Sequence, residues 1–146
     1  MIALRPARQS ETEAETLVAI WAEAARAAHP FLPGEGRGER RRLMRDMHLP
    51  AATVTVAEAD GAAQGFLAMT GGGRIGGLFV RPGAQRRGIG RALVGAAGDG
   101  PLTADVYLRN EAGLAFWRAM DFAEAARGLD GQSSEVVVTV MREARA

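Results

Sequence analysis

The sequence predicts an α/β fold in which helices pack on a mixed β-sheet. Short alternating segments typical of strands come first as a meander, and later strands are separated by helical segments, as a mixed sheet requires. The 146 residues are enough for one hydrophobic core and too few for two, and 47% of them are apolar. We therefore expect residues 1–146 to form a single domain of this class.

The first third of the chain predicts one strand and two helices. Residues 2–7 read as a short strand that ends at Pro6. The sequence SETE at 10–13 has the spacing of a capping box, and apolar residues then recur at helical intervals. A basic helix is expected at about 37–48, with Pro50 as its stop.

The remaining elements follow from alternation and turn residues. Residues 53–70 predict a hairpin that turns at Asp60-Gly61. Further along, the sequence predicts strands at 74–80, 102–108, 122–127 and 135–141, a helix from the glycine-rich turn to about Ala97, and a helix at 111–120. The last strand is apolar on both faces, which suits either a central strand or a dimer contact, so a monomer and a homodimer are both open.

Composition excludes several classes of protein. The net charge is only +1, which argues against a nucleic-acid partner, and the basic segment 37–45 also has an apolar face, as a surface helix does. There is no apolar run of about 18 residues, so we expect no membrane span. The N-terminus lacks signal-peptide features, which predicts a cytoplasmic protein. Cysteine is absent, no pattern predicts a metal site, and all 18 Lys and Arg positions are arginine.

The stretch AQRRGIGRALV at 84–94 predicts an anion site. Unpaired N–H groups at a helix N-terminus attract anions, and glycines let the backbone approach phosphate oxygens closely. The neighbouring arginines add charge-assisted hydrogen bonds. A P-loop is excluded because the chain has no lysine, and a Rossmann fingerprint because Leu93 stands where the third glycine belongs.

The longer stretch LFVRPGAQRRGIGRALV resembles the acetyl-coenzyme A motif of the GNAT superfamily of N-acetyltransferases. That motif is a strand ending in valine, here Val80, often followed two residues later by a proline, here Pro82. Next comes Gln/Arg-x-x-Gly-x-Gly/Ala at the start of a helix, which matches Gln85, Gly88 and Gly90. The resemblance implies that acetyl-coenzyme A is the cosubstrate.

A second segment, NEAGLAFWRAMDF at 110–122, is similar to the Asn-x-x-Ala-x-x-Phe-Tyr-x-x-x-Gly-Phe segment of the same superfamily. The resemblance covers nearly the whole chain. It implies a mixed, mostly antiparallel sheet of six to seven strands, splayed between the fourth and fifth strands and flanked by about four helices. It leaves one alternative to an enzyme, a non-catalytic module of the same fold that senses acyl-coenzyme A.

The resemblance also implies which residues bind acetyl-coenzyme A. In the superfamily, backbone groups of the strand before the glycine loop pair with the pantetheine amides, and the loop holds the pyrophosphate. Gly76 and Gly77 suit the bulge that such a splay needs. Carried over, the cofactor-binding residues are Leu78, Phe79, Val80, Gln85, Arg86, Arg87, Gly88, Ile89, Gly90, Arg91, Asn110, Phe116 and Trp117. Asn110 is also a good N-cap for the helix that follows it.

Two positions depart from the pattern of the superfamily. Trp117 stands where many members have the tyrosine that protonates the leaving thiolate, and an indole N–H donates a hydrogen bond without giving up its proton near neutral pH. Trp117 therefore either stabilises the sulfur or packs in the core. Asp121 replaces the usual glycine, which is tolerable because Asp enters the left-handed region.

Acetyl transfer to an amine needs a base, because an alkylammonium with a pKa of about 10 is not nucleophilic. Asp105 lies where members that acetylate peptide amines can have a Glu base, and Tyr107 follows on the same strand face. This pair either shares base and acid roles or covers the sheet and pairs with arginines. His29, in the link that helps to form the acceptor pocket of the superfamily, is the third catalytic candidate. Glu58 fits a solvated carboxylate better than a base, and His48 fits a structural role at a helix end.

The sequence thus predicts an N-acetyltransferase that moves an acetyl group from acetyl-coenzyme A to a primary amine by direct nucleophilic attack. The acceptor is expected to be a small-molecule or peptide amine. Residues 29–50 and 127–135, which would line its pocket, carry too little pattern to identify it.

Overall fold

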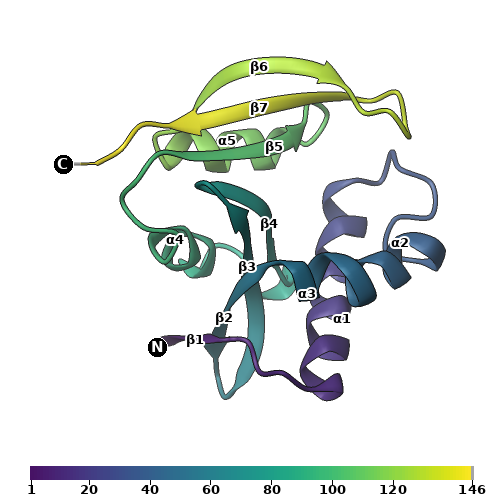
Figure 1. Ribbon diagram of the computed structural model, residues 1–146, viewed down its shortest axis with the longest axis vertical. Coiled ribbons are helices and arrows are strands. Elements are labelled where there is room, and N and C mark those ends of the chain that lie inside the picture. Colours follow the sequence, from purple (N-terminus) through teal and green to yellow (C-terminus); the bar gives the residue numbers. More distant parts are fainter. Residues whose placement is uncertain (146) are drawn as a thin grey trace.

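The computed structural model describes residues 1–145 as a seven-stranded sheet with helices on both faces (Figure 1). The strand order is β1-β2-β3-β4-β5-β7-β6, and every neighbouring pair is antiparallel except β4 and β5. The strands are β1 (Ile2–Pro6), β2 (Thr53–Ala59), β3 (Ala62–Gly71), β4 (Arg74–Val80), β5 (Leu102–Tyr107), β6 (Ala123–Leu129) and β7 (Val136–Arg142). The helical segments are α1 (Glu11–Ala28), α2 (Gly38–Leu43), the π-helical turn η1 (Met44–His48), α3 (Leu49–Ala51), the 3₁₀ turn η2 (Pro82–Ala84), α4 (Ile89–Gly95) and α5 (Glu111–Ala119).

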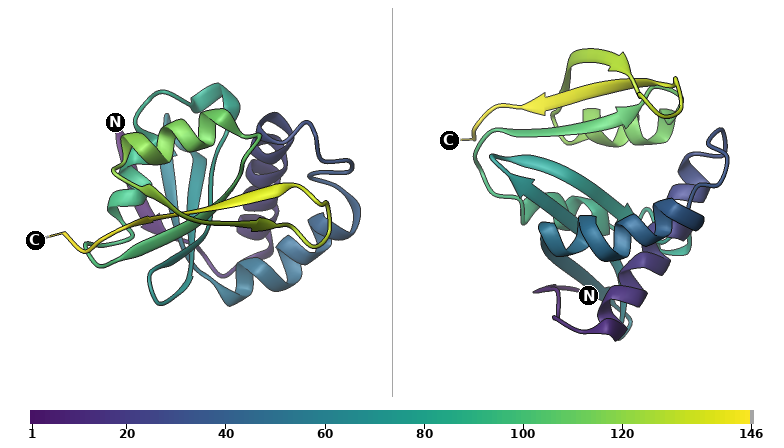
Figure 2. Two further views of the ribbon diagram at one scale, coloured as in Figure 1. Left: turned by 90° about the horizontal axis from the view of Figure 1, so that it is seen from above. Right: turned by 45° about the vertical axis from the view of Figure 1, so that its right-hand side comes forward.

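This architecture confirms the predicted mixed, mostly antiparallel sheet and its splay between the fourth and fifth strands. β4 and β5 pair at Arg74–Thr103 and Ile75–Ala104 and then diverge (Figure 2). The splay divides the sheet into two parts. We call β1–β4 with α1 to α4 the N-terminal arm, and β5–β7 with α5 the C-terminal arm.

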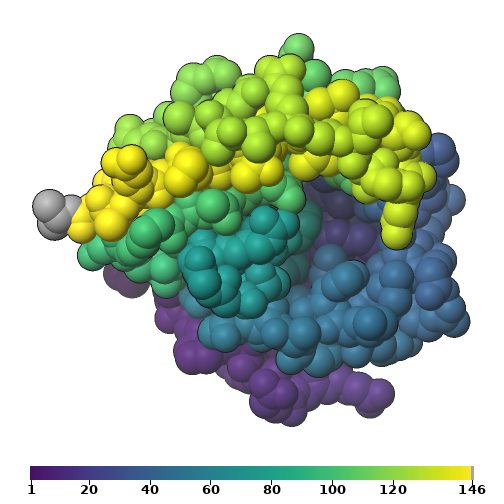
Figure 3. All heavy atoms as spheres, turned by 45° about the horizontal axis from the view of Figure 1, so that its top comes forward, coloured from purple at the N-terminus to yellow at the C-terminus, as the bar shows by residue number. Residues whose placement is uncertain are grey.

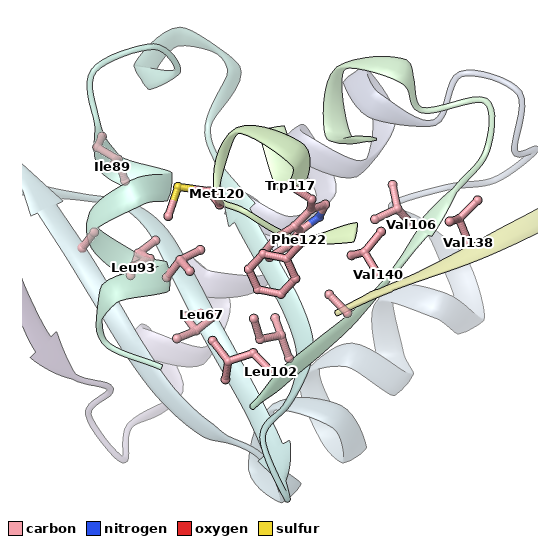
Figure 4. Packing of buried hydrophobic residues seen from close by; sticks show 14 of the residues in the cluster. Leu67, Ile89, Leu93, Leu102, Val106, Trp117, Met120, Phe122, Val138 and Val140 are labelled. Carbon is pink, nitrogen blue, oxygen red and sulfur yellow. The ribbon is translucent and has the colours of Figure 1, made fainter. Parts of the chain in front are cut away.

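One hydrophobic cluster joins the two arms on the face of the sheet where α4 and α5 pack (Figure 4). Because side chains alternate along a strand, β5 directs Leu102, Ala104 and Val106 to this face, and all three are buried. Leu67 of β3 and Leu93 of α4 belong to the same cluster. The arms therefore share a core on this face while their strands separate.

Helix α1 covers the opposite face of the N-terminal arm. Ser10 Oγ accepts the Glu13 N–H at 3.1 Å, so the predicted N-cap is confirmed. The buried stripe of the helix includes Ile20 and Trp21, and it packs with the fully buried Phe66 of β3.

The helix predicted at about 37–48 is longer than expected, and the prediction that Pro50 stops it is wrong. α2, η1 and α3 follow one another without a break. Pro50 lies in the first turn of α3, where a missing N–H is tolerated. The residues before it widen into a π turn, in which the Leu49 N–H donates to Met44 O.

The remaining elements lie close to their predicted positions. The hairpin turns at Asp60 and Gly61, whose φ angles of 56° and 77° are those of a two-residue hairpin turn. β7 lies between β5 and β6 with Val138 and Val140 buried, so the central position is the one it occupies. No helix within residues 1–145 combines the length and the apolar character needed to cross a membrane.

Replacing Phe66 by Ala is expected to lower the free energy of unfolding by about 3–5 kcal/mol, because a fully buried ring leaves a cavity. Equilibrium urea unfolding measures this loss. Met47→Ala is the control, since Met47 is 58% exposed, and its effect should stay within about 0.5 kcal/mol. A loss below about 1 kcal/mol for Phe66→Ala would contradict the packing of α1 on β3.

Candidate active site

The edge of β4 that faces the splay presents backbone groups without a partner strand. The Arg81 N–H donates to Gln64 O at 2.8 Å, so this cross-strand pair is a hydrogen-bonded one. Hydrogen-bonded and non-hydrogen-bonded pairs alternate along an antiparallel ladder. Phe79 therefore bonds to β3, whereas the N–H and C=O groups of Leu78 and Val80 point into the splay.

Gly76 marks the start of the splay. The register of β3 and β4 runs from Ala68–Gly77 to Met69–Ile75, so Gly76 is an extra residue in β4. Ile75 also forms the last β4–β5 pair. The predicted bulge is thereby confirmed, and it lies at the point where β4 leaves β5.

The glycine-rich loop before α4 holds six consecutive backbone N–H groups, from Arg86 to Arg91. Among residues 1–145, no acceptor lies within hydrogen-bond geometry of any of the six. Arg86 and Gly88 have left-handed φ angles of 64° and 84°. Loops of this kind turn successive N–H groups into a concavity that binds anions. The loop fits the predicted pyrophosphate site.

The three arginines of this loop differ in their surroundings. Arg87 Nη2 lies 2.8 Å from Asp60 Oδ2, and this contact holds the pKa of the Asp60 carboxyl below its usual value. Arg86 and Arg91 are exposed and pair with no acidic side chain of residues 1–145. Arg87 is therefore anchored on the β2–β3 turn, and the other two guanidinium groups are free to meet a ligand.

Helices α4 and α5 approach each other closely at Gly90. A Cβ at Gly90 would lie 3.0 Å from the ring of Phe116, which is tighter than ordinary van der Waals contact. Asn110 begins α5, and its Oδ1 accepts the Gly113 N–H at 3.0 Å, as predicted for an N-cap. The structure thus places Phe116 beside the helix that starts at the glycine loop.

Trp117 packs in the hydrophobic cluster shared by the two arms. Its side chain is 7% exposed, and its ring lies 4.8 Å from Phe122 and 5.1 Å from Phe116, measured between centroids. Figure 4 shows Trp117 and Phe122 within this cluster. Both contacts are edge-to-face, the geometry that aromatic pairs favour. Of the two alternatives for Trp117, packing in the core accounts for these contacts.

On the opposite face, His29, Phe31 and Tyr107 form a cluster that we call the aromatic trio. Ring centroids lie 4.8 Å apart for His29–Tyr107, 5.7 Å for Phe31–Tyr107 and 5.8 Å for His29–Phe31. His29 and Phe31 belong to the α1–α2 connection, and Tyr107 ends β5. The trio therefore links the two arms, and it brings together two of the three predicted catalytic residues.

Tyr107 is held by Asp130, a residue of the predicted pocket stretch 127–135 that the sequence did not single out. Its hydroxyl donates to Asp130 Oδ2 at 3.1 Å, from the β6–β7 turn. Burial, together with this neighbouring carboxylate, raises the pKa of the Tyr107 phenol above its usual value. The phenol therefore keeps its proton at neutral pH and directs it at Asp130, so its oxygen is available as a hydrogen-bond acceptor.

Asp105, the third predicted catalytic residue, lies near the closed end of the splay. Its Oδ2 accepts from Arg74 Nη2 and its Oδ1 accepts from Thr139 Oγ1, both at 2.7 Å. Burial opposes ionisation, but these two hydrogen bonds outweigh it, so the pKa of the Asp105 carboxyl lies below its usual value. Asp105 lies on the same face of β5 as Tyr107, but its carboxylate forms no hydrogen bond with His29 or Tyr107.

The other candidates from the sequence lie away from the aromatic trio. Glu58 Oε2 accepts from Arg5 Nε at 2.9 Å on the β1–β2 ladder, and His48 is exposed at the end of η1. Glu35 and Arg40, which lie beside His29 and Tyr107, were missed by sequence reasoning.

The two arms border a hollow in the molecular surface. Figure 3 shows it between the β6–β7 turn, the tip of the β3–β4 hairpin and the helices that follow residue 37. The β6–β7 turn carries Asp130, and the α1–α2 connection carries His29. The hollow therefore opens beside the elements that hold the aromatic trio.

The splayed sheet and the amide-rich loop at its opening fit the acetyl-coenzyme A site that the resemblance to the GNAT superfamily implies. The family model for the acetyltransferase (GNAT) domain matches residues 50–124. The chain is 33% identical over 121 residues to the peptidyl-lysine N-acetyltransferase YiaC of Escherichia coli K12, which covers 82% of each chain. It is 35% identical over 131 residues to the peptidyl-lysine N-acetyltransferase YjaB of Salmonella typhimurium, covering 87% of each.

Solved structures show the same fold. Apo YjaB from Escherichia coli superposes with a TM-score of 0.81 at 30% identity, over 97% of both chains. The PaiA N-acetyltransferase of Thermoplasma acidophilum, solved in complex with coenzyme A, superposes with a TM-score of 0.73 at 18% identity, over 99% of both chains.

The chain therefore belongs to the GNAT acetyltransferase family. It is an N-acetyltransferase that uses acetyl-coenzyme A as the acetyl donor and an amine as the acceptor. The transferase is favoured over the alternative of a non-catalytic acyl-coenzyme A module.

Replacing Asp105 by Asn is expected to lower the stability at pH 7 by less than about 1 kcal/mol, because the ion pair with Arg74 is partly exposed. The lowered pKa means that the ionised carboxylate stabilises the fold above its unfolded-state pKa of about 3.9. That contribution is lost as the pH falls through the folded-state pKa. Thermal unfolding from pH 7 to pH 2 should therefore show the two proteins converging at the acid end. A constant difference across this range would contradict the ion pair.

Proposed function

We propose that this enzyme acetylates the side-chain amine of lysine residues in peptides or proteins. The observation that carries this proposal is the similarity to relatives named peptidyl-lysine N-acetyltransferases, which are 33% to 36% identical over 82% to 87% of the chain. The surface hollow between the arms supports the proposal, because a lysine within a polypeptide needs an open site that its side chain can enter while the peptide backbone stays outside.

The splay and the glycine loop hold the donor in this proposal. Acetyl-coenzyme A supplies an acetyl group that is activated as a thioester. Leu78 and Val80 offer backbone N–H and C=O groups to the pantetheine amides, and the N–H groups of residues 86–91 bind the pyrophosphate. A strand N–H directed into the splay also stabilises negative charge on the thioester oxygen. Phe79, whose backbone bonds to β3, contributes through its side chain.

His29 and Tyr107 handle the acceptor amine. The lysine ammonium loses one proton to His29, and the nitrogen of the resulting amine bonds to the acetyl carbon while the carbon–sulfur bond breaks. The nitrogen releases its second proton to solvent as the amide forms. The sulfur leaves as a thiolate and takes a proton from solvent. The Tyr107 hydroxyl donates its hydrogen bond to Asp130, so its oxygen accepts a hydrogen bond from the incoming amine and orients it.

Asp105 is the competing candidate for the base. Both of its oxygens are engaged by Arg74 and Thr139, which favours the alternative that it pairs with a nearby arginine. In this alternative, Asp105 connects the start of β4 to β5 and β7 through Arg74 and Thr139, and proton transfer does not pass through it.

Exchanging His29 for Gln is expected to lower kcat by about 100-fold or more, the usual contribution of a general base. Tyr107→Phe is expected to lower kcat by about tenfold, because the hydrogen bond that orients the amine is lost. Release of thiol from acetyl-coenzyme A with a lysine-containing peptide measures both, and a peptide with arginine in place of lysine gives the background. The enzyme has no lysine of its own, so acetyl-lysine in the assay comes from the peptide. Asp105→Asn should retain most of kcat; a loss of about 100-fold there, with His29→Gln active, would assign the base to Asp105.

Gly88→Ala is expected to weaken acetyl-coenzyme A binding by about tenfold, because a side chain at a φ of 84° costs about 1–2 kcal/mol in the conformation that the loop needs. Gly83→Ala is the matched control, since a Cβ there meets nothing within 4 Å and its φ is not left-handed. Isothermal titration calorimetry compares the two dissociation constants. Equal affinities would argue against this loop as the pyrophosphate site.

A further inference from the structure

Glu35 is a buried acidic side chain that forms no hydrogen bond within residues 1–145. The buried charged side chains of residues 1–145 are Glu13, Glu35 and Arg142. Glu13 forms hydrogen bonds with Arg5 and with the Arg8 N–H, and Arg142 donates to Met120 O at the end of α5. The Glu35 carboxylate, at 6% exposure, forms no hydrogen bond with residues 1–145. Burying an acidic side chain without a hydrogen bond is costly, so the position of Glu35 suggests a function for its carboxylate.

The α1–α2 connection is folded so that Glu35 turns inward. Gly34 and Gly36 on either side have left-handed φ angles of 71° and 83°. A Cβ at Gly36 would lie 3.2 Å from the Ala22 backbone of α1, so glycine lets the loop press against the helix. The Glu35 N–H donates to Leu32 O at 3.4 Å, which closes a turn. These features fix the carboxylate beneath the aromatic trio.

The carboxylate faces His29. Glu35 Oε2 lies 3.5 Å from His29 Nδ1, and this nitrogen is buried without a hydrogen-bond partner among residues 1–145. Arg40 Nη1 lies 3.6 Å from the same oxygen. A carboxylate only accepts hydrogen bonds, whereas a neutral imidazole donates from one nitrogen and accepts at the other. A lone pair on Nδ1 would face the negative charge, so the favourable arrangement puts the proton on Nδ1.

We propose that Glu35 is a positioning residue that keeps the proton of neutral His29 on Nδ1 and thereby leaves Nε2 as the basic nitrogen. When Nε2 takes the proton of the acceptor amine, the imidazolium that forms is stabilised by the carboxylate behind it. This inference rests on the proposed role of His29. It adds a carboxylate–imidazole pair, contributed entirely by the α1–α2 connection, to the machinery for accepting a lysine.

Arg40 defines the competing explanation. Arg40 lies next to the same Glu35 oxygen as His29, and its positive charge also acts to lower the pKa values of Tyr107 and Asp130. In this alternative, the role of Glu35 is to hold Arg40 near the Tyr107 phenol. The two explanations predict different partners for the effect of a Glu35 substitution on activity. In the first, the effect depends on His29, and in the second it depends on Arg40.

Nitrogen-15 NMR reads the tautomer of His29 directly and does not depend on acetyl transfer. The chain has two histidines, and His48→Gln leaves the signals of His29 alone. We expect neutral His29 to carry its proton on Nδ1 and Glu35→Leu to shift the population toward the Nε2 form. A neutral His29 with its proton on Nε2 in the parent protein would overturn the proposal, whether or not lysine is the acceptor.

A kinetic double-mutant cycle separates the two explanations. Glu35→Gln is expected to lower kcat by about tenfold with an unchanged KM for acetyl-coenzyme A, and to cause no further loss in a His29→Gln background. The loss should persist in an Arg40→Gln background. Glu39→Gln on the exposed face of α2 is the matched control, and thermal unfolding checks that each variant folds. A loss that persists without His29 and disappears without Arg40 would overturn the proposal.

Discussion

The separation of β4 from β5 after two residue pairs is the constraint on which the rest of the structure depends. A sheet normally satisfies its backbone groups by strand pairing, and an open edge inside a sheet leaves N–H and C=O groups for another partner. Three features keep this edge open. Gly76 introduces a bulge, Asp105 ties β5 to Arg74 at the closed end, and the hydrophobic cluster around Trp117 fixes the C-terminal arm against α4.

The two faces of the splay have different chemistry because side chains alternate along β5. Val106 points to the face of α4 and α5, where the loop with free N–H groups begins a helix. Tyr107 points to the face of α1, where it meets the α1–α2 connection and the β6–β7 turn. In the proposed mechanism, the phosphate groups of the donor bind on the face of α4 and α5, and the acceptor amine binds on the face of α1. The two reactants then meet where Leu78 and Val80 present unpaired backbone groups.

Local signals in the sequence predicted most of the fold, including the glycine loop that we propose as the donor site. The Ser10 cap, the Asp60-Gly61 turn and the glycine loop each depend on residues within a few positions of one another. The predicted helix end at Pro50 was wrong, because a proline is tolerated in the first turn of a helix and Pro50 lies in the first turn of α3. Glu35, Arg40 and Asp130 were missed because their roles depend on contacts with His29 and Tyr107 that only the tertiary fold creates. The sequence could not predict that the backbone of Phe79 bonds to β3, because this depends on the register of the β3–β4 ladder.

Residue-resolved amide hydrogen exchange with and without acetyl-coenzyme A tests most directly whether the open edge of β4 and the glycine loop hold the donor. We expect the N–H groups of Leu78, Val80 and residues 86–91 to exchange fast in the free enzyme and to become protected when acetyl-coenzyme A binds. The Phe79 N–H, already bonded to β3, should be protected in both states. Binding without new protection at Leu78, Val80 and the loop would contradict the role of the splay.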